Sequence, residues 1–352
     1  MRPCTSLSGL DLPSGGHLTH GFYTYSKAEN RRKAVSATSV YFESLPYRVD
    51  QTTGIVDYDA LEKQAALFKP AMLIMGGSAY PREWNYEKFS QIAKDNGSLL
   101  LMDMAHISGL VATGEAVSPF KYADVVTTTT HKSLRGPRAG MIFYRKDERD
   151  FETKIANAVF PGLQGGPHMH QIAGVATQLK EVMTPEFKEY AKQVKANAAA
   201  LADKLSSLGY TIATGGTENH LVLWDLKPQG TNGSKIQTVC DACNITLNKN
   251  AVLGDRSALT PGGVRIGAPA LTTRGLKEDG FIKVAEFLHN AVQIALKIQG
   301  SAPKITMKEF TDAVKKSPEV KDLKFAVQTF ITQYPMPGFD TATMRYKTVV
   351  HE

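Results

Sequence analysis

The sequence predicts an α/β protein in which a mostly parallel sheet is covered by helices, followed by a smaller α+β domain. The first observation is that, from residue 54 onward, short apolar runs alternate with amphipathic helical stretches. The second is a long helical stretch that begins near residue 184 and separates this pattern from shorter strands beyond it. We therefore expect a large domain over residues 1–183 and a small domain over residues 184–352.

In the large domain, Asp59 and Glu62 form a capping-box pair that predicts the start of a helix, and Pro70 predicts its end. Apolar runs and helical spacing then predict two successive β-α-β steps. The expected elements are strands at Ala71–Met75, Leu99–Met102, Ala123–Thr128 and Gly140–Tyr144, with a helix at Glu83–Asn96. Ligands of such sheets gather at the carboxyl ends of the strands, so polar residues there are the first candidates for function.

In the small domain, Thr184 as N-cap and Pro185 in the first turn predict a long helix that runs to Gly209. Short strands and helices alternate after it. The expected strands are His220–Trp224, Ile245–Asn248 and Val264–Ile266, and the expected helices are Gly233–Cys243, Phe281–Ile298 and Pro318–Tyr334.

Composition excludes several classes of protein. In 352 residues no apolar run approaches the roughly 20 residues of a membrane-spanning helix. Only three cysteines are present, which favours a reducing compartment, and the Cys240-x-x-Cys243 pair has no second pair at zinc spacing, so we expect no metal. The formal charge of +7 suits nucleic acid or small anions. Because no Lys/Arg run or RNA-binding aromatic signature occurs, small phosphates and carboxylates are favoured.

The strongest chemical candidate is Lys132, which lies in the run Thr127–Gly140 directly after a predicted strand. His131 precedes it, and Arg138 follows within a Gly-Pro-Arg sequence. A partly desolvated lysine can lose its proton near neutral pH and form a Schiff base with an aldehyde. A phosphate-binding loop in which Lys132 is only a point charge explains the spacing equally well.

Asp103 ends an apolar strand, where a carboxylate without a partner would be costly, so we expect a cationic partner. In a pyridoxal phosphate enzyme an aspartate keeps the ring nitrogen protonated, which makes the ring an electron sink. Asp103 and Lys132, each after its own strand, fit that layout. The alternative is that Asp103 is a helix N-cap.

Five motifs together resemble serine hydroxymethyltransferase of the eukaryotic type, and the match covers nearly the whole chain from residue 9. They are residues 9–21, 103–106, 125–140, 162–167 and 262–270. The resemblance implies a pyridoxal-phosphate-dependent transferase of fold type I, similar to aspartate aminotransferase, with a smaller C-terminal domain. It also implies a homodimer or homotetramer with shared active sites, in the cytoplasm or the mitochondrion.

The resemblance implies catalytic roles for Lys132, Asp103, His17 and His106. Lys132 would form the Schiff base, Asp103 would pair with the ring nitrogen, and His17 would stack on the ring. Further cofactor contacts are implied for Ser78, His131, Gly165 and Gly166, the two glycines reaching the phosphate of a neighbouring subunit. From the residues alone, His17 could be an ordinary loop histidine, and Gly165-Gly166 a turn that starts a helix.

For the substrates, the resemblance implies that Arg265 grips the amino-acid carboxylate, which suits a planar two-pronged cation; a surface strand arginine is the alternative. Positions that line the folate site are implied at Leu12, Gly16, Leu18, Asn248, Ser257, Ala258 and Leu259. Arg138 resembles a conformational support and could equally be a salt-bridge residue.

The implied reaction interconverts serine and glycine and transfers a one-carbon unit to tetrahydrofolate, the cosubstrate. The family pattern has roughly a quarter of its length before the Gly15-Gly16-His17 motif, including a loop that cups the phosphate, so we expect weaker cofactor binding here. Two alternatives follow. One is another pyridoxal-phosphate-dependent aldolase. The other is a non-catalytic or truncated subunit that dimerises with a complete chain.

Overall fold

The computed structural model describes residues 5–26, 29–255, 260–301 and 304–343. The chain divides into two compact units, residues 1–192 with 251–258, and residues 193–250 with 259–352. The division falls inside helix α7 (Pro185–Ser207). Among the described residues no helix is long and apolar enough to cross a membrane.

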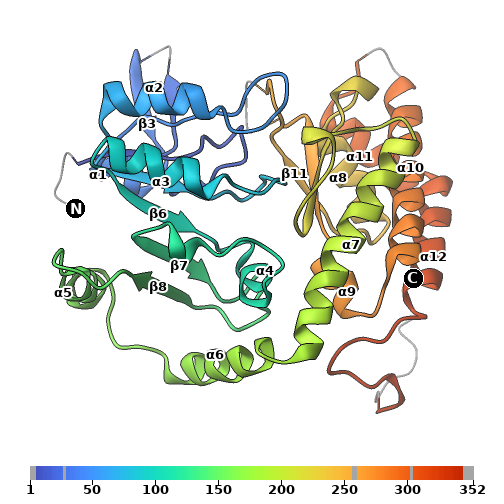
Figure 1. Cartoon of the computed structure of the whole chain (residues 1–352). Coiled ribbons are helices and arrows are strands. Elements are labelled where there is room, and N and C mark those ends of the chain that lie inside the picture. Colours follow the sequence, from blue (N-terminus) through green and yellow to red (C-terminus); the bar gives the residue numbers. More distant parts are fainter. Residues whose placement is uncertain (1–4, 27–28, 256–259, 302–303, 344–352) are drawn as a thin grey trace. The chain divides into compact units, whose positions relative to one another are not determined.

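The first unit is built on a six-stranded sheet with the order β4-β1-β5-β6-β7-β8, in which only β8 is antiparallel to its neighbour (Figure 1). The predicted β-α-β steps are confirmed. The strands are β1 (Ser6–Ser8), β4 (Glu43–Ser44), β5 (Met72–Met75), β6 (Leu99–Asp103), β7 (Val125–Thr129) and β8 (Gly140–Tyr144), and β2 (Tyr23–Ser26) pairs separately with β3 (Arg31–Ala34).

Helices α2 and α3 lie side by side on one face of this sheet (Figure 1), and their apolar side chains join one buried core with those of β5 and β6. Phe89 and Ile92 of α3 are fully buried in it. The helices of this unit are α1 (Ala37–Tyr41), α2 (Tyr58–Phe68), α3 (Tyr86–Asp95), α4 (Ser108–Thr113), α5 (Phe151–Asn157) and α6 (Met169–Val182), with shorter turns η1 (Pro119–Lys121) and η2 (Ala158–Leu163).

The predicted capping box of α2 is wrong. Asp57 is the N-cap, and its side chain accepts a hydrogen bond from the Ala60 amide at 2.9 Å. Asp59 lies in the first turn, and Glu62 instead accepts from Lys88 Nζ of α3 at 2.7 Å. Two acidic residues near a helix start can both suit its dipole, so the spacing alone chose the wrong one.

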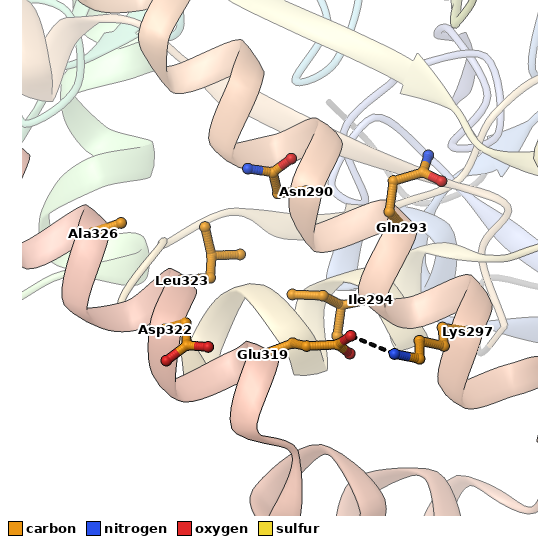
Figure 2. A pocket seen from close by; sticks show the side chains of 8 residues that line it. All are labelled: Asn290, Gln293, Ile294, Lys297, Glu319, Asp322, Leu323 and Ala326. Carbon is orange, nitrogen blue, oxygen red and sulfur yellow. Dashed lines mark hydrogen bonds and ion pairs between the residues drawn. The ribbon is translucent and has the colours of Figure 1, made fainter.

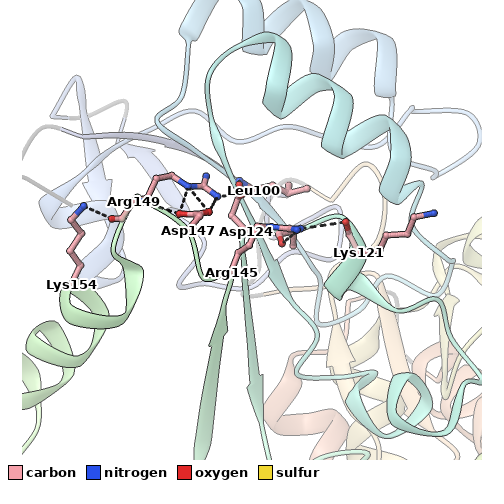
Figure 3. Close-up of polar contacts among 8 residues, drawn as sticks. Leu100, Lys121, Asp124, Arg145, Asp147, Arg149 and Lys154 are labelled. Atoms are coloured by element: carbon pink, nitrogen blue, oxygen red, sulfur yellow. Dashed lines mark hydrogen bonds and ion pairs between the residues drawn. The ribbon is translucent and has the colours of Figure 1, made fainter.

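An ionic network fixes the edge of the sheet opposite the carboxyl ends of the parallel strands (Figure 3). Asp124, just before β7, accepts from the Leu100 amide of β6 at 2.9 Å and from Arg149 Nη2 at 2.7 Å. Arg149 also pairs with Asp147, and Arg145 Nη2 donates to the Ala123 carbonyl at 3.1 Å. These bonds tie the segment after β8 to the amino ends of β6 and β7.

The second unit contains a four-stranded antiparallel sheet with the order β11-β12-β10-β9. Its strands are β9 (Thr211–Ile212), β10 (Leu221–Asp225), β11 (Asn248–Asn250) and β12 (Gly263–Gly267). Its helices are α8 (Gly233–Ala242), α9 (Pro269–Thr273), α10 (Glu278–Gly300), α11 (Met307–Lys316) and α12 (Pro318–Ile331), with turns η3 (Ala213–Gly215), η4 (Lys227–Gln229) and η5 (Thr341–Thr343). The strand expected at Ile245–Asn248 begins only at Asn248.

Between α10 and α12 lies an open cavity of about 430 Å³, where Lys297 of α10 pairs with Glu319 of α12 (Figure 2). Asn290, Gln293 and Ile294 line it from α10, and Asp322, Leu323 and Ala326 from α12. None of the site residues predicted from the sequence lines this cavity.

Candidate functional site

The polar residues predicted to carry chemistry in the first unit follow four neighbouring parallel strands, β1, β5, β6 and β7. The loop after β1 carries His17 and His20, and the loop after β5 carries Ser78. The carbonyl of Gly15 joins these two loops, because it accepts from the amides of Ser78 at 2.7 Å and Ala79 at 3.1 Å. We call this group of loops, with the two that follow β6 and β7, the strand-edge site.

Asp103 is the last residue of β6, and both of its carboxylate oxygens are bonded. Oδ1 accepts from the Ala105 amide at 3.1 Å, and Oδ2 lies 2.9 Å from His20 Nε2. Gly76 passes so close that an added Cβ would lie 2.5 Å from the Asp103 carbonyl, so this position excludes a side chain. Helix α4 begins after Ile107 as N-cap, so the alternative that Asp103 caps a helix is wrong.

Lys132 lies in the loop that joins β7 to β8, and two neighbours hold this loop. Thr130 Oγ1 donates to the Pro137 carbonyl at 2.6 Å. Ser133 Oγ donates to the His106 carbonyl at 2.8 Å and accepts from the Gly109 amide at 2.9 Å. The loop of Lys132 is therefore tied directly to the loop that carries Asp103 and His106.

The charges of this site act on one another. Burial raises the pKa of Asp103, but the hydrogen bond and charge of His20, the Ala105 amide and the charge of Lys132 outweigh it, so the pKa lies below its ordinary value. Burial, together with the charges of His20 and Lys132, lowers the pKa of His17. Burial and the charges of Arg138 and Lys132 lower the pKa of His131. At neutral pH the site thus holds a carboxylate and two neutral imidazoles.

These shifts predict a pH dependence of stability. Because the pKa of His17 and that of His131 are lowered on folding, the unfolded chain takes up protons first as the pH falls below about 6.5. The free energy of unfolding should therefore decrease between pH 7.5 and pH 5.5. Urea unfolding at both values measures the decrease, which should be smaller in the His17→Gln variant. An equal decrease in the variant and the wild type would contradict this assignment for His17.

Two buried polar atoms beside Lys132 accept or donate no hydrogen bond within the described part of the chain. They are Oγ1 of Thr129 and Nδ1 of His131. A buried polar atom without a partner is costly, so such atoms commonly face a bound group. Donors of this kind, next to a lysine and a carboxylate, fit the phosphate and ring oxygens of pyridoxal phosphate.

The second unit holds the predicted carboxylate-binding residue. Arg265 lies in β12 opposite Asn248 of β11, and its Nε donates to Asn248 Oδ1 at 3.2 Å. Burial lowers the pKa of Arg265. Its alternative role as a surface arginine is disfavoured by this partial burial. Asn248, predicted for the folate site, is thus a direct neighbour of Arg265.

The other predicted residues are placed as follows. Leu12 is half-buried, Gly16 is buried, and Leu18 is 41% exposed, all in the loop after β1. Gly165 and Gly166 lie in an exposed segment before α6, with no atom within 4 Å of an added Cβ among the described residues. Arg138 is exposed. Ser257, Ala258 and Leu259 lie outside the described residues.

His20 and Ser133 are site residues to which the sequence analysis gave no role. His20 is 6% exposed and is separated from Asp103 by 83 positions, so no local pattern joins them. The available signal was the expectation of a partner for Asp103, combined with a second histidine three residues after His17. Ser133 gave no signal, because its bonds depend on how two loops meet.

The geometry defines a class of protein: an α/β enzyme whose site lies at the carboxyl edge of a parallel sheet, with a lysine and an ionised aspartate on adjacent strands. A family model described as serine hydroxymethyltransferase matches residues 1–288. The chain belongs to the serine hydroxymethyltransferase family. Members are pyridoxal-phosphate-dependent enzymes of fold type I that interconvert serine and glycine with tetrahydrofolate as cosubstrate, as the resemblance implied.

Curated relatives agree over nearly the full chain. Serine hydroxymethyltransferase 4 of Arabidopsis thaliana is 58% identical over 99% of this chain and 75% of its own length. The chloroplastic serine hydroxymethyltransferase 3 of the same plant is 52% identical over 96% of this chain and 64% of its own length. The cytosolic enzyme of Oryctolagus cuniculus is 50% identical over 96% of this chain and 72% of its own length.

Proposed function

We propose that this chain binds pyridoxal phosphate in the strand-edge site and interconverts serine and glycine. The observation that carries the proposal is the ionised Asp103, held by His20 at 2.9 Å and acted on by the charge of Lys132. A carboxylate and an amine on adjacent strands can hold opposite ends of one heterocycle. A simple phosphate-binding loop would need the lysine but not a buried, oriented carboxylate.

When bound, the cofactor supplies an electron sink for the bond cleavage at Cα of serine. Lys132 is the nucleophile that attaches it. Asp103 holds a proton on the ring nitrogen, and His20 orients Asp103. His17, kept neutral by its lowered pKa, stacks on the ring without adding a charge. Ser78 and His106 contact the ring oxygen, and His131 contacts the phosphate.

The substrate groups are held by other residues of the chain. Arg265 grips the amino-acid carboxylate, and Asn248 orients its guanidinium through the 3.2 Å bond. Leu12, Gly16, Leu18 and Asn248, together with Ser257, Ala258 and Leu259, line the site for the pterin of tetrahydrofolate. The partly exposed Leu18 offers the apolar wall that a planar pterin needs.

We also propose that the active form is a homodimer with a shared site. Support comes from helix α6, in which Val182 is the only residue classed as buried, and from apolar side chains before and within it that are exposed: Phe160 (61%), Leu163 (83%) and Met169 (67%). Gly165 and Gly166 lie in this exposed segment and would reach the partner's phosphate. Sedimentation of the Leu163→Glu variant should show monomers, whereas an unchanged dimer would contradict this surface.

The proposed function is tested by adding pyridoxal phosphate to the purified chain and reducing it with borohydride. We expect a visible absorbance band and, after digestion, the reduced adduct on the peptide that contains Lys132. The Lys132→Arg variant keeps the charge and should show no adduct there. An adduct spread over surface lysines, equal in wild type and variant, would overturn the proposal. Absence of an adduct with retained binding to a full-length relative would support the non-catalytic subunit instead.

A further inference from the structure

We propose that Arg135 is a positioning residue that fixes the loop of Lys132 onto α6 and α7. The inference rests on the proposed function in taking Lys132 as the nucleophile. Arg135 lies three residues after Lys132 and touches neither the cofactor residues nor Arg265 in any contact described above. Its effect would therefore pass through the backbone of the loop.

The backbone of Arg135 closes the turn that carries Lys132. Its φ of 61° is in the left-handed region, which residues other than glycine rarely adopt. In this conformation the Arg135 amide donates to the Lys132 carbonyl at 2.9 Å, and the Gly136 amide donates to the Thr130 carbonyl at 2.7 Å. Such a conformation persists only where surrounding contacts hold it.

The side chain of Arg135 supplies those contacts. Its Nη2 donates to Glu181 Oε1 of α6 at 2.6 Å. Its Cζ lies 4.3 Å from the ring centre of Tyr190 and 4.9 Å from that of Phe187, both in α7. Phe187 is 2% exposed, so the guanidinium rests on a fixed aromatic surface. An ion pair and a planar cation over two rings together define one orientation.

Lys132 thus lies between two anchors. On one side, Ser133 bonds to the carbonyl of His106 and the amide of Gly109. On the other, Arg135 and the buried Leu134 join a cluster with Val182 and Phe187. A lysine side chain is long and flexible, so the position of its amine depends on how well its backbone is held. Loss of Arg135 would leave only the Ser133 anchor.

The experiment compares wild type, Arg135→Ala, Arg135→Lys and Glu181→Gln, with Arg31→Ala as control because Arg31 is 74% exposed and pairs only with Glu29 among the printed ion pairs. Hydrogen exchange is followed at the Gly136 amide, and borohydride trapping on Lys132 at one subsaturating concentration of pyridoxal phosphate. In Arg135→Ala we expect exchange about tenfold faster and trapping about tenfold lower, from losing one ion pair and two ring contacts.

Glu181→Gln should shift both readouts in the same direction by less, and Arg135→Lys should be intermediate, because an ammonium keeps the charge but does not stack. Amides of the β7–β8 ladder and the Arg31→Ala protein should match wild type. Unchanged exchange and trapping in Arg135→Ala overturn the proposal. If that variant does not fold, unchanged Gly136 exchange in Glu181→Gln overturns it. If wild type shows no trapping, the proposed function fails, while exchange still decides whether Arg135 holds the loop.

Discussion

The Asp103→Asn variant is expected to lose serine–glycine interconversion by a factor on the order of a hundred to a thousand, because an amide cannot hold a proton on the ring nitrogen as a carboxylate does. Asparagine keeps the volume, and its Oδ1 can still accept from His20 Nε2. The change therefore removes the charge with little change to the fold. The rate is measured as cleavage of serine with saturating pyridoxal phosphate and tetrahydrofolate.

The matched control is Asp95→Asn, at the exposed end of α3, where the carboxylate accepts only from Gln91 among the printed hydrogen bonds. This variant should keep the wild-type rate. A rate for Asp103→Asn within threefold of wild type would show that the charge of Asp103 is not used in the reaction. The absorbance of bound cofactor separates a lost chemical step from lost binding.

The His20→Leu variant is expected to be destabilised by about 3 kcal/mol, because it removes one member of a buried pair and leaves the Asp103 carboxylate without its main donor. His20 is 6% exposed and leucine is apolar and of similar size, so the cavity contribution is small. Urea unfolding of the variant measures the loss. In the double variant with Asp103→Asn the loss should be smaller, since no charge is then stranded.

The same variant should reverse a pH slope. In wild type the pKa of Asp103 is lowered on folding, so its contribution to stability is present above pH 4 and is lost as the pH falls through the folded pKa. Without His20, burial is the largest remaining influence and raises the pKa of Asp103, so the variant should become relatively less stable as the pH rises from 4 to 7. A difference from wild type that is independent of pH would contradict the pairing.

Much of the fold could be predicted because its strands are continuous apolar runs. All four residues of β5 are buried, and a run of this kind between helical patterns indicates a parallel strand. The strand β8 has the bounds that the sequence predicted, Gly140–Tyr144. Thr184 does cap α7, since its Oγ1 accepts from the Phe187 amide at 3.3 Å.

The elements that were not predicted are short and polar. Strand β1 has the sequence Ser-Leu-Ser, and it is a strand because β4 and β5 pair with it on both sides. Strand β11 consists of Asn-Lys-Asn and depends on β12 in the same way. In such segments the partner strand decides the structure, and a local pattern contains no information about that partner.

The candidate site divides along similar lines. Lys132 and Asp103 could be predicted because each is a polar residue at the end of an apolar strand. The roles of His20, Ser133 and Arg135 could not, since their partners lie 83, 27 and 46 positions away in the bonds to Asp103, His106 and Glu181. Residues that touch the chemistry thus have a local signature, whereas those that orient them are recognised only once the loops are placed.

A crystal structure of the chain reduced with borohydride in the presence of pyridoxal phosphate tests the central claim most directly. The account predicts a covalent bond from Lys132 Nζ to the cofactor and a hydrogen bond of about 2.7–2.9 Å between the ring nitrogen and a carboxylate oxygen of Asp103. A cofactor attached to Lys132 whose ring nitrogen faces solvent or another residue would contradict it.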